Sequence, residues 1–110
     1  MAYDDMHVVM YKILSYLYKC LKAGEKVDMR MISADALGIN GVYHDRIIRE
    51  LVTRGYVDGY KVVELPTGFV SMTPVDPMVT MTGVEFLMEN SMMRKAFEFL
   101  RDAKDALPFL

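Results

Sequence analysis

A short turn rich in glycine and asparagine joins two helical patterns in the first half of the chain. Gly38 and Gly41 flank this turn and Asn40 lies within it. Glycine ends helices because it adopts left-handed backbone angles, and asparagine caps a following helix by accepting hydrogen bonds from its first amides. A short helix over residues 33–37 and a longer one over residues 42–54 are therefore predicted. Together they form a helix-turn-helix unit.

An amphipathic helix is predicted before this unit, over residues 4–22. Apolar residues recur there at steps of three and four, which places them on one face: Met6, Val9, Met10, Ile13, Leu14, Leu17 and Leu21. Gly24 supplies the stop. The single cysteine, Cys20, lies in the same pattern and is expected to be a buried thiol.

A β-hairpin is predicted after the third helix, with strands over residues 56–65 and 69–73. The first strand is rich in Val and Tyr, and Pro66, Thr67 and Gly68 form the turn. Two prolines follow, Pro74 and Pro77. Because proline has no N–H, they are expected to end regular pairing or to hold the returning strand at an edge.

Two further helices are predicted, over residues 81–89 and 92–107. Thr80 caps the first, and Asn90 with Ser91 separates the two. Three N-terminal helices, a hairpin and two C-terminal helices make an α+β, mainly helical fold, the winged helix-turn-helix. We expect one such domain over residues 1–110, since this length and 53% apolar residues suit a single modest core.

Three segments carry a resemblance to a known family: Leu37–Ile39, Leu51–Gly59 and Thr80–Met93. The last is the most specific, with the sequence Thr-Met-Thr-Gly-Val-Glu-Phe-Leu-Met-Glu-Asn-Ser-Met-Met. On these segments the chain resembles the YjcQ family of small, mostly phage- or prophage-borne proteins. The resemblance implies a winged helix, and it implies no established biochemical role or catalytic residues.

The third predicted helix is the candidate DNA-binding element. A helix-turn-helix places its second helix in the major groove, where early residues contact base edges. If Ile47, Ile48 and Leu51 face inward, helical spacing turns five other positions outward: Tyr43, Arg46, Arg49, Glu50 and Thr53. We expect Tyr43, Arg46, Arg49 and Thr53 to contact double-stranded DNA, with Lys61 of the first wing strand adding a backbone contact. Transcriptional regulation is one function that a DNA-binding protein of this fold performs.

The net charge and the acidic residues near the arginines limit the strength of the DNA binding that we expect. The net charge is −2, and the wing tip carries no Lys or Arg. Asp45 and Glu50 share the helix with the arginines and repel phosphate. Moderate, salt-sensitive and sequence-dependent binding is therefore expected. The alternative is a solvated helix face on a winged-helix module that mediates protein contacts or assembly.

The last predicted helix offers a candidate homodimer interface, made of Phe97, Phe99, Leu100 and Leu107. Phe99 lies beside the apolar stripe of this helix and extends it. A two-fold dimer would present two recognition helices to two half-sites.

The sequence contains no motif typical of a catalytic or cofactor-binding site. His7 and His44 belong to different predicted helices, where each is expected to be a surface residue, and no glycine-rich phosphate loop occurs. We expect no enzyme activity, no cofactor and no metal site. No apolar stretch approaches the roughly 18 residues of a membrane span, and the start of the chain lacks a secretory signal. A cytoplasmic protein without a membrane partner is expected.

Overall fold

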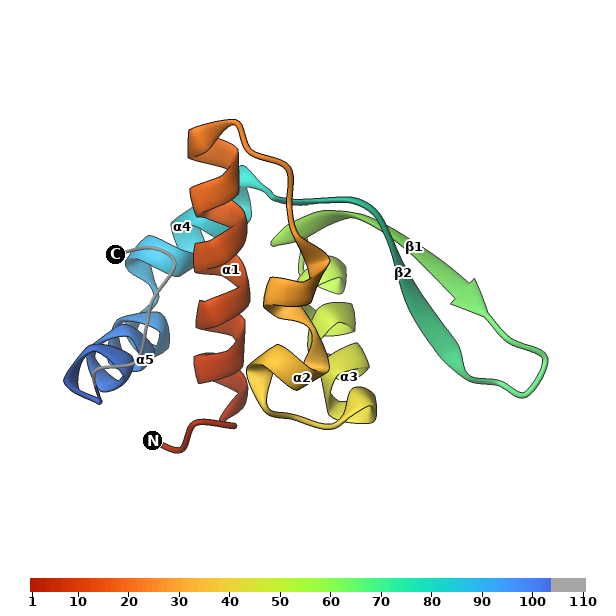
Figure 1. The fold of residues 1–110 in the computed structure, drawn as a ribbon, viewed down its shortest axis with the longest axis horizontal. Helices are drawn as coiled ribbons and strands as arrows, with labels where there is room; N and C mark the ends of the chain where they lie inside the picture. Colours follow the sequence, from red (N-terminus) through yellow and green to blue (C-terminus); the bar gives the residue numbers. More distant parts are fainter. Residues whose placement is uncertain (104–110) are drawn as a thin grey trace.

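The computed structural model describes residues 1–103 and shows an α+β, mainly helical fold with an antiparallel hairpin (Figure 1). This confirms the predicted fold class and is consistent with a winged helix. The elements are α1 (Met6–Ala23), the 3-10 helix η1 (Met29–Ile32), α2 (Ala34–Leu37), α3 (Gly41–Thr53), β1 (Val57–Glu64), β2 (Val70–Val79), α4 (Met81–Glu89) and α5 (Ser91–Asp102). Within the described residues, no helix is long and apolar enough to cross a membrane.

The core is built around α1. This helix stands between α4 and α5 on one side and α2 and α3 on the other (Figure 1). Its predicted apolar face is buried from Val9 to Leu17, whereas Met6 is only partly buried and Leu21 is 49% exposed. Cys20 is a free thiol with only 2% of its surface exposed. The inward face of α3 is also as predicted, since Ile47, Ile48 and Leu51 are buried.

The helix-turn-helix is fixed by side-chain caps at the predicted positions. Ser33 Oγ accepts a hydrogen bond from the Ala36 amide at 3.2 Å, and Asn40 Oδ1 accepts one from the Tyr43 amide at 2.8 Å. Between them, Gly38 adopts the left-handed conformation, with φ 69°. These caps satisfy amides that have no partner within their own helices.

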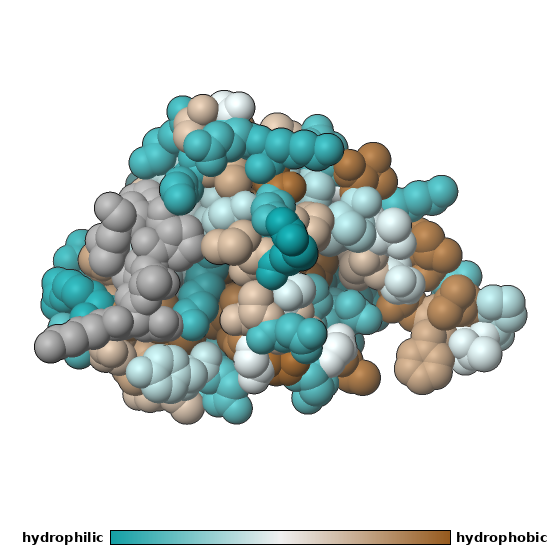
Figure 2. All heavy atoms as spheres, viewed as in Figure 1, coloured by the Kyte–Doolittle hydropathy of each residue, from teal (hydrophilic) through white to brown (hydrophobic). Residues whose placement is uncertain are grey.

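The wing is longer than predicted. Its second strand, β2, continues past both prolines to Val79, where Val79 pairs with Val57 of β1. Pro74 and Pro77 therefore do not end the pairing, although they do lie on an edge strand of a two-stranded sheet. The wing projects from the helical body, and hydrophobic residues lie along its surface (Figure 2).

A bulge opposite Gly59 allows the strands to continue. Asp58 pairs with Met78 and Tyr60 with Pro74, so the single residue Gly59 faces residues 75–77. Gly59 has φ 86°, and a Cβ atom there would clash with the carbonyl group of Asp76. The bulge thus depends on glycine, because any side chain would meet backbone atoms.

The start of α4 also packs closely against the turn that follows α3. The Thr80 hydroxyl caps α4 by accepting from the Gly83 amide at 3.0 Å, and it also donates to the Gly55 carbonyl. A Cβ on Gly83 would lie 2.2 Å from the Tyr56 carbonyl oxygen. The Thr-x-x-Gly pattern, formed by Thr80 and Gly83, therefore holds the start of α4 against the turn that precedes the wing.

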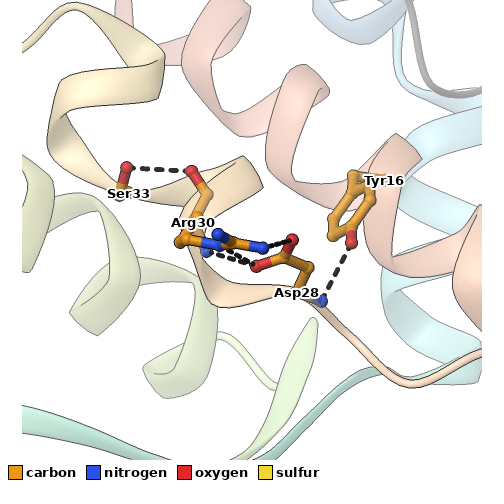
Figure 3. Close-up of polar contacts among 4 residues, drawn as sticks. All are labelled: Tyr16, Asp28, Arg30 and Ser33. Carbon is orange, nitrogen blue, oxygen red and sulfur yellow. Dashed lines mark hydrogen bonds and ion pairs between the residues drawn. The ribbon is translucent and has the colours of Figure 1, made fainter.

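The loop between α1 and α2 contains η1, which the sequence did not predict. The Asp28 carboxylate accepts from the Arg30 amide at 3.1 Å and pairs with Arg30 Nη2 at 3.0 Å (Figure 3). The Asp28 amide donates to the Tyr16 hydroxyl at 2.9 Å, which ties the loop to α1. A single 3-10 turn has no apolar period, so patterning cannot reveal it.

The final helix ends earlier than predicted among the described residues. α5 runs from Ser91 to Asp102 instead of from residue 92 to 107, and Ala103 follows as its C-cap. Asn90 caps its start by accepting from the amides of Met92 and Met93 at 2.9 and 3.2 Å. Leu107 lies outside the described residues.

Candidate nucleic-acid interface

A groove separates the first half of α3 from the tip of the wing. Its volume is about 520 Å³, and it is lined by Val42, Asp45, Arg46, Arg49, Gly68, Phe69 and Val70. Two of the predicted DNA-binding residues, Arg46 and Arg49, thus face the wing across an open channel.

Val42, Arg46 and Arg49, which line the α3 side of the groove, belong to one helical stripe that continues to Thr53 outside the groove. Val42, Arg46, Arg49 and Thr53 are spaced by four, three and four residues, which places them on the same face. All four are exposed. Within residues 1–103, neither Arg46 nor Arg49 takes part in an ion pair. Their charges are therefore available to an external anion.

Glu50 forms an ion pair with Arg54 and not with Arg46 or Arg49. Its Oε2 lies 2.9 Å from Nε of Arg54, one helical turn further on. This hydrogen bond holds the pKa of Glu50 below its ordinary value, and the positive charges of Arg46 and Arg49 lower it further. The expected repulsion between Glu50 and phosphate is thus reduced by a neighbouring cation.

Asp45 remains a negative charge inside the groove. Its side chain is 57% exposed, and its Oδ1 lies 3.9 Å from Nδ1 of the His44 ring. The His44 ring itself lies against η1, where Nε2 is 2.7 Å from the Ile32 carbonyl oxygen. The expectation that His44 is a surface residue is wrong, since its side chain is only 17% exposed.

Tyr43 does not face the groove. Its side chain is half-buried, and its hydroxyl donates to the Asp4 carbonyl at 2.7 Å. Burial raises the pKa of Tyr43, and the charges of Asp4 and Asp5 add to the effect. The outward placement predicted for Tyr43 is wrong because this residue lies one turn before Ile47, at the margin of the buried face.

Thr53 and Lys61 lie outside the groove. Thr53 is exposed at the last position of α3. Lys61 is exposed on β1, where it pairs with Thr73. Of the five predicted contacts, only Arg46 and Arg49 line the groove.

Two exposed apolar residues of the groove were missed at the level of sequence. Val42 is 79% exposed and Phe69 is 70% exposed. Val42 could have been found from its spacing, because it precedes Arg46 by four residues. Phe69 has no such signal, since its place opposite α3 depends on how the wing folds back.

Three of the four predicted dimer residues lie in the described part of the chain, and all three make contacts within it. The Phe97 ring stacks on Tyr11 with centroids 5.9 Å apart, and the Phe99 ring contacts Tyr3 at 5.2 Å. Both phenylalanines remain partly exposed. Leu100 is fully buried and cannot reach a second copy in this fold, so its assignment to an interface is wrong.

Metal-ligating residues do not cluster in the described part of the chain. No group of three or more His, Cys, Asp or Glu side chains there is arranged to hold an ion.

The arrangement defines a winged-helix protein in which α3 and the wing border an arginine-bearing groove. The family model described as YjcQ protein matches residues 11–106, nearly the whole chain. The chain belongs to the YjcQ family, as its sequence resemblance indicated. No curated protein and no solved structure gives a significant match.

Proposed function

We propose that the chain binds double-stranded DNA by placing α3 in the major groove, with the wing alongside. One observation carries this proposal: Arg46 and Arg49 are exposed, lie one turn apart on the groove and have no ion-pair partner in the described chain. Arginine forms bidentate hydrogen bonds with guanine or with phosphate, so this pair suits either contact.

In this proposal the attraction to DNA comes from the arginines of the groove and not from the net charge of the chain. The net charge of −2 gives no long-range pull toward phosphate. Asp45 opposes phosphate within the groove, but a carboxylate can accept a hydrogen bond from the cytosine amino group in the major groove. Both features favour moderate, sequence-dependent binding over strong non-specific binding. We therefore propose a transcriptional regulator of the phage type, acting on DNA without a cofactor.

Fluorescence anisotropy with labelled duplexes of about 20 base pairs, two helical turns, tests the proposal. Arg46→Gln/Arg49→Gln should weaken binding at low salt by about tenfold or more, because charged hydrogen bonds are lost. Arg94→Gln/Lys95→Gln removes the same charge from exposed positions on α5 and should leave binding nearly unchanged. Equal losses in both variants, or no binding by the native chain, would refute the assignment.

A protein-assembly module is the second candidate, and the exposed apolar wing favours it. Val62, Phe69 and Val75 are 57%, 70% and 72% exposed. Partly exposed Phe97 and Phe99 offer a separate contact through α5, where we propose a homodimer. Sedimentation over a wide concentration range tests both surfaces. Phe69→Ser should abolish self-association through the wing, and Phe99→Ser should abolish association through α5; a constant monomer mass would exclude both.

A further inference from the structure

Resting on the proposed DNA binding, we propose that Val42 and Phe69 recognise the 5-methyl group of thymine. These residues supply exposed apolar surface to the groove that Arg46 and Arg49 also line. The groove then has two functions: its arginines hold the duplex, and its apolar walls select a thymine-bearing strand.

The position of Val42 supports a base contact. Asn40 caps α3, so Val42 is the second residue of the helix and lies at its exposed N-terminal end. Early residues of a recognition helix are those that contact base edges. Val42 also shares a face with Arg46 and Arg49, so any duplex that both arginines touch lies over the Val42 side chain.

Phe69 is held opposite this end of α3 by the wing turn. Its carbonyl accepts from the Leu65 amide at 2.8 Å, and the Gly68 amide donates to the Leu65 carbonyl at 2.9 Å. These bonds close the turn and leave the phenyl side chain exposed at the groove. The wing tip therefore offers an apolar ring at a place where a basic residue would bind phosphate.

Thymine is the base whose chemistry matches these side chains. In the major groove its methyl group is the only apolar substituent among the four bases, and phenylalanine and small aliphatic groups contact it in protein–DNA complexes. A methyl group buried against Val42 and Phe69 is removed from water, which strengthens binding by about fourfold per group. An apolar protein partner would instead leave both arginines without a counter-charge.

Replacement of thymine by deoxyuridine tests this inference, because it removes only the methyl group. A duplex is first enriched from a random-sequence pool by the native chain, and each thymine is then replaced in turn. At one position or more, the native chain should bind the deoxyuridine duplex about fourfold more weakly. Val42→Ser should bind both duplexes equally, and Phe69→Ser should bring the ratio closer to one.

Val75→Ser is the matched control. Val75 is also an exposed valine, at 72%, but it lies on β2 outside the groove, so this variant should keep the native ratio. Equal binding of both duplexes by the native chain, or an unchanged ratio in Val42→Ser, overturns the thymine contact while leaving DNA binding intact. No binding to any duplex overturns both proposals, and a change of mass in Phe69→Ser without a change in DNA affinity assigns the wing to a protein contact.

Discussion

Arg54 Nε lies 2.9 Å from Glu50 Oε2, and in this ion pair Arg54 balances the negative charge of Glu50, the one glutamate of α3. Glu50 lies in the last turn of α3, and Arg54, four positions further on, is the C-cap residue of this helix. Arg54 therefore acts as an internal counter-ion, and its presence reduces the negative potential that Glu50 adds near Arg46 and Arg49.

Loss of this counter-ion should weaken DNA binding indirectly. We expect Arg54→Gln to reduce affinity by roughly two- to fivefold, because an unpaired carboxylate then repels phosphate across solvent. Glu50→Gln/Arg54→Gln should restore most of the affinity, since it removes the repelling charge as well. Anisotropy titrations of the native chain and the variants measure both effects. If the double variant binds as weakly as Arg54→Gln, Arg54 contacts DNA itself.

The bulge of the wing should depend on Gly59. Gly59→Ala places a Cβ against the Asp76 carbonyl group at a positive φ, so we expect it to lower the free energy of unfolding by about 2 kcal/mol or more. Gly68→Ala is the control, because Gly68 has φ 87° but open space around it. That variant should cost about 1 kcal/mol. Urea denaturation compares them, and equal losses would mean that the close approach at Gly59 is unimportant.

The hydroxyl of Tyr60 is buried without a hydrogen-bond partner among the described residues. We expect Tyr60→Phe to raise the free energy of unfolding by about 1 kcal/mol, because an unsatisfied polar group is removed. Tyr16→Phe is a matched control, since the Tyr16 hydroxyl accepts from the Asp28 amide at 2.9 Å. That change should lower stability by about 1 kcal/mol. Destabilisation by Tyr60→Phe would show that this hydroxyl has a stabilising partner.

Burial of Tyr60 also predicts a response to alkaline pH. Desolvation raises its pKa from 10.0 to about 12 in the folded chain. The folded state therefore favours the neutral phenol, and this contribution to stability is complete below pH 10 and is lost as the pH rises toward 12. Urea denaturation across this range should show a smaller stability loss in Tyr60→Phe than in the native chain. Identical pH profiles would contradict the burial of this phenol.

The helices and their caps could be predicted because their causes are local. Ser33, Asn40 and Thr80 each accept a hydrogen bond from the amide three residues further on. The apolar period of α3 identifies Ile47 and Leu51 as buried. Such features depend on spacing along one helix, so the sequence is sufficient to find them.

The remaining features depend on contacts between distant segments. Helical spacing places Tyr43 at the margin of the buried face, and only the fold shows that its hydroxyl donates to the Asp4 carbonyl. The continuation of β2 past Pro74 requires the bulge opposite Gly59. The groove itself exists because the wing brings Phe69 back toward α3. Arg46 and Arg49 were predicted, but their apolar neighbours could be assigned only from the fold.

The salt dependence of DNA binding tests the central claim most directly. Affinity of the native chain for the enriched duplex is measured from about 50 to about 200 mM salt, together with Arg46→Gln and Arg49→Gln. If the arginines bind phosphate, log affinity falls linearly with log salt, and each substitution reduces the slope by about one. A slope near zero for the native chain, or slopes unchanged by both substitutions, would contradict DNA binding through the α3 groove.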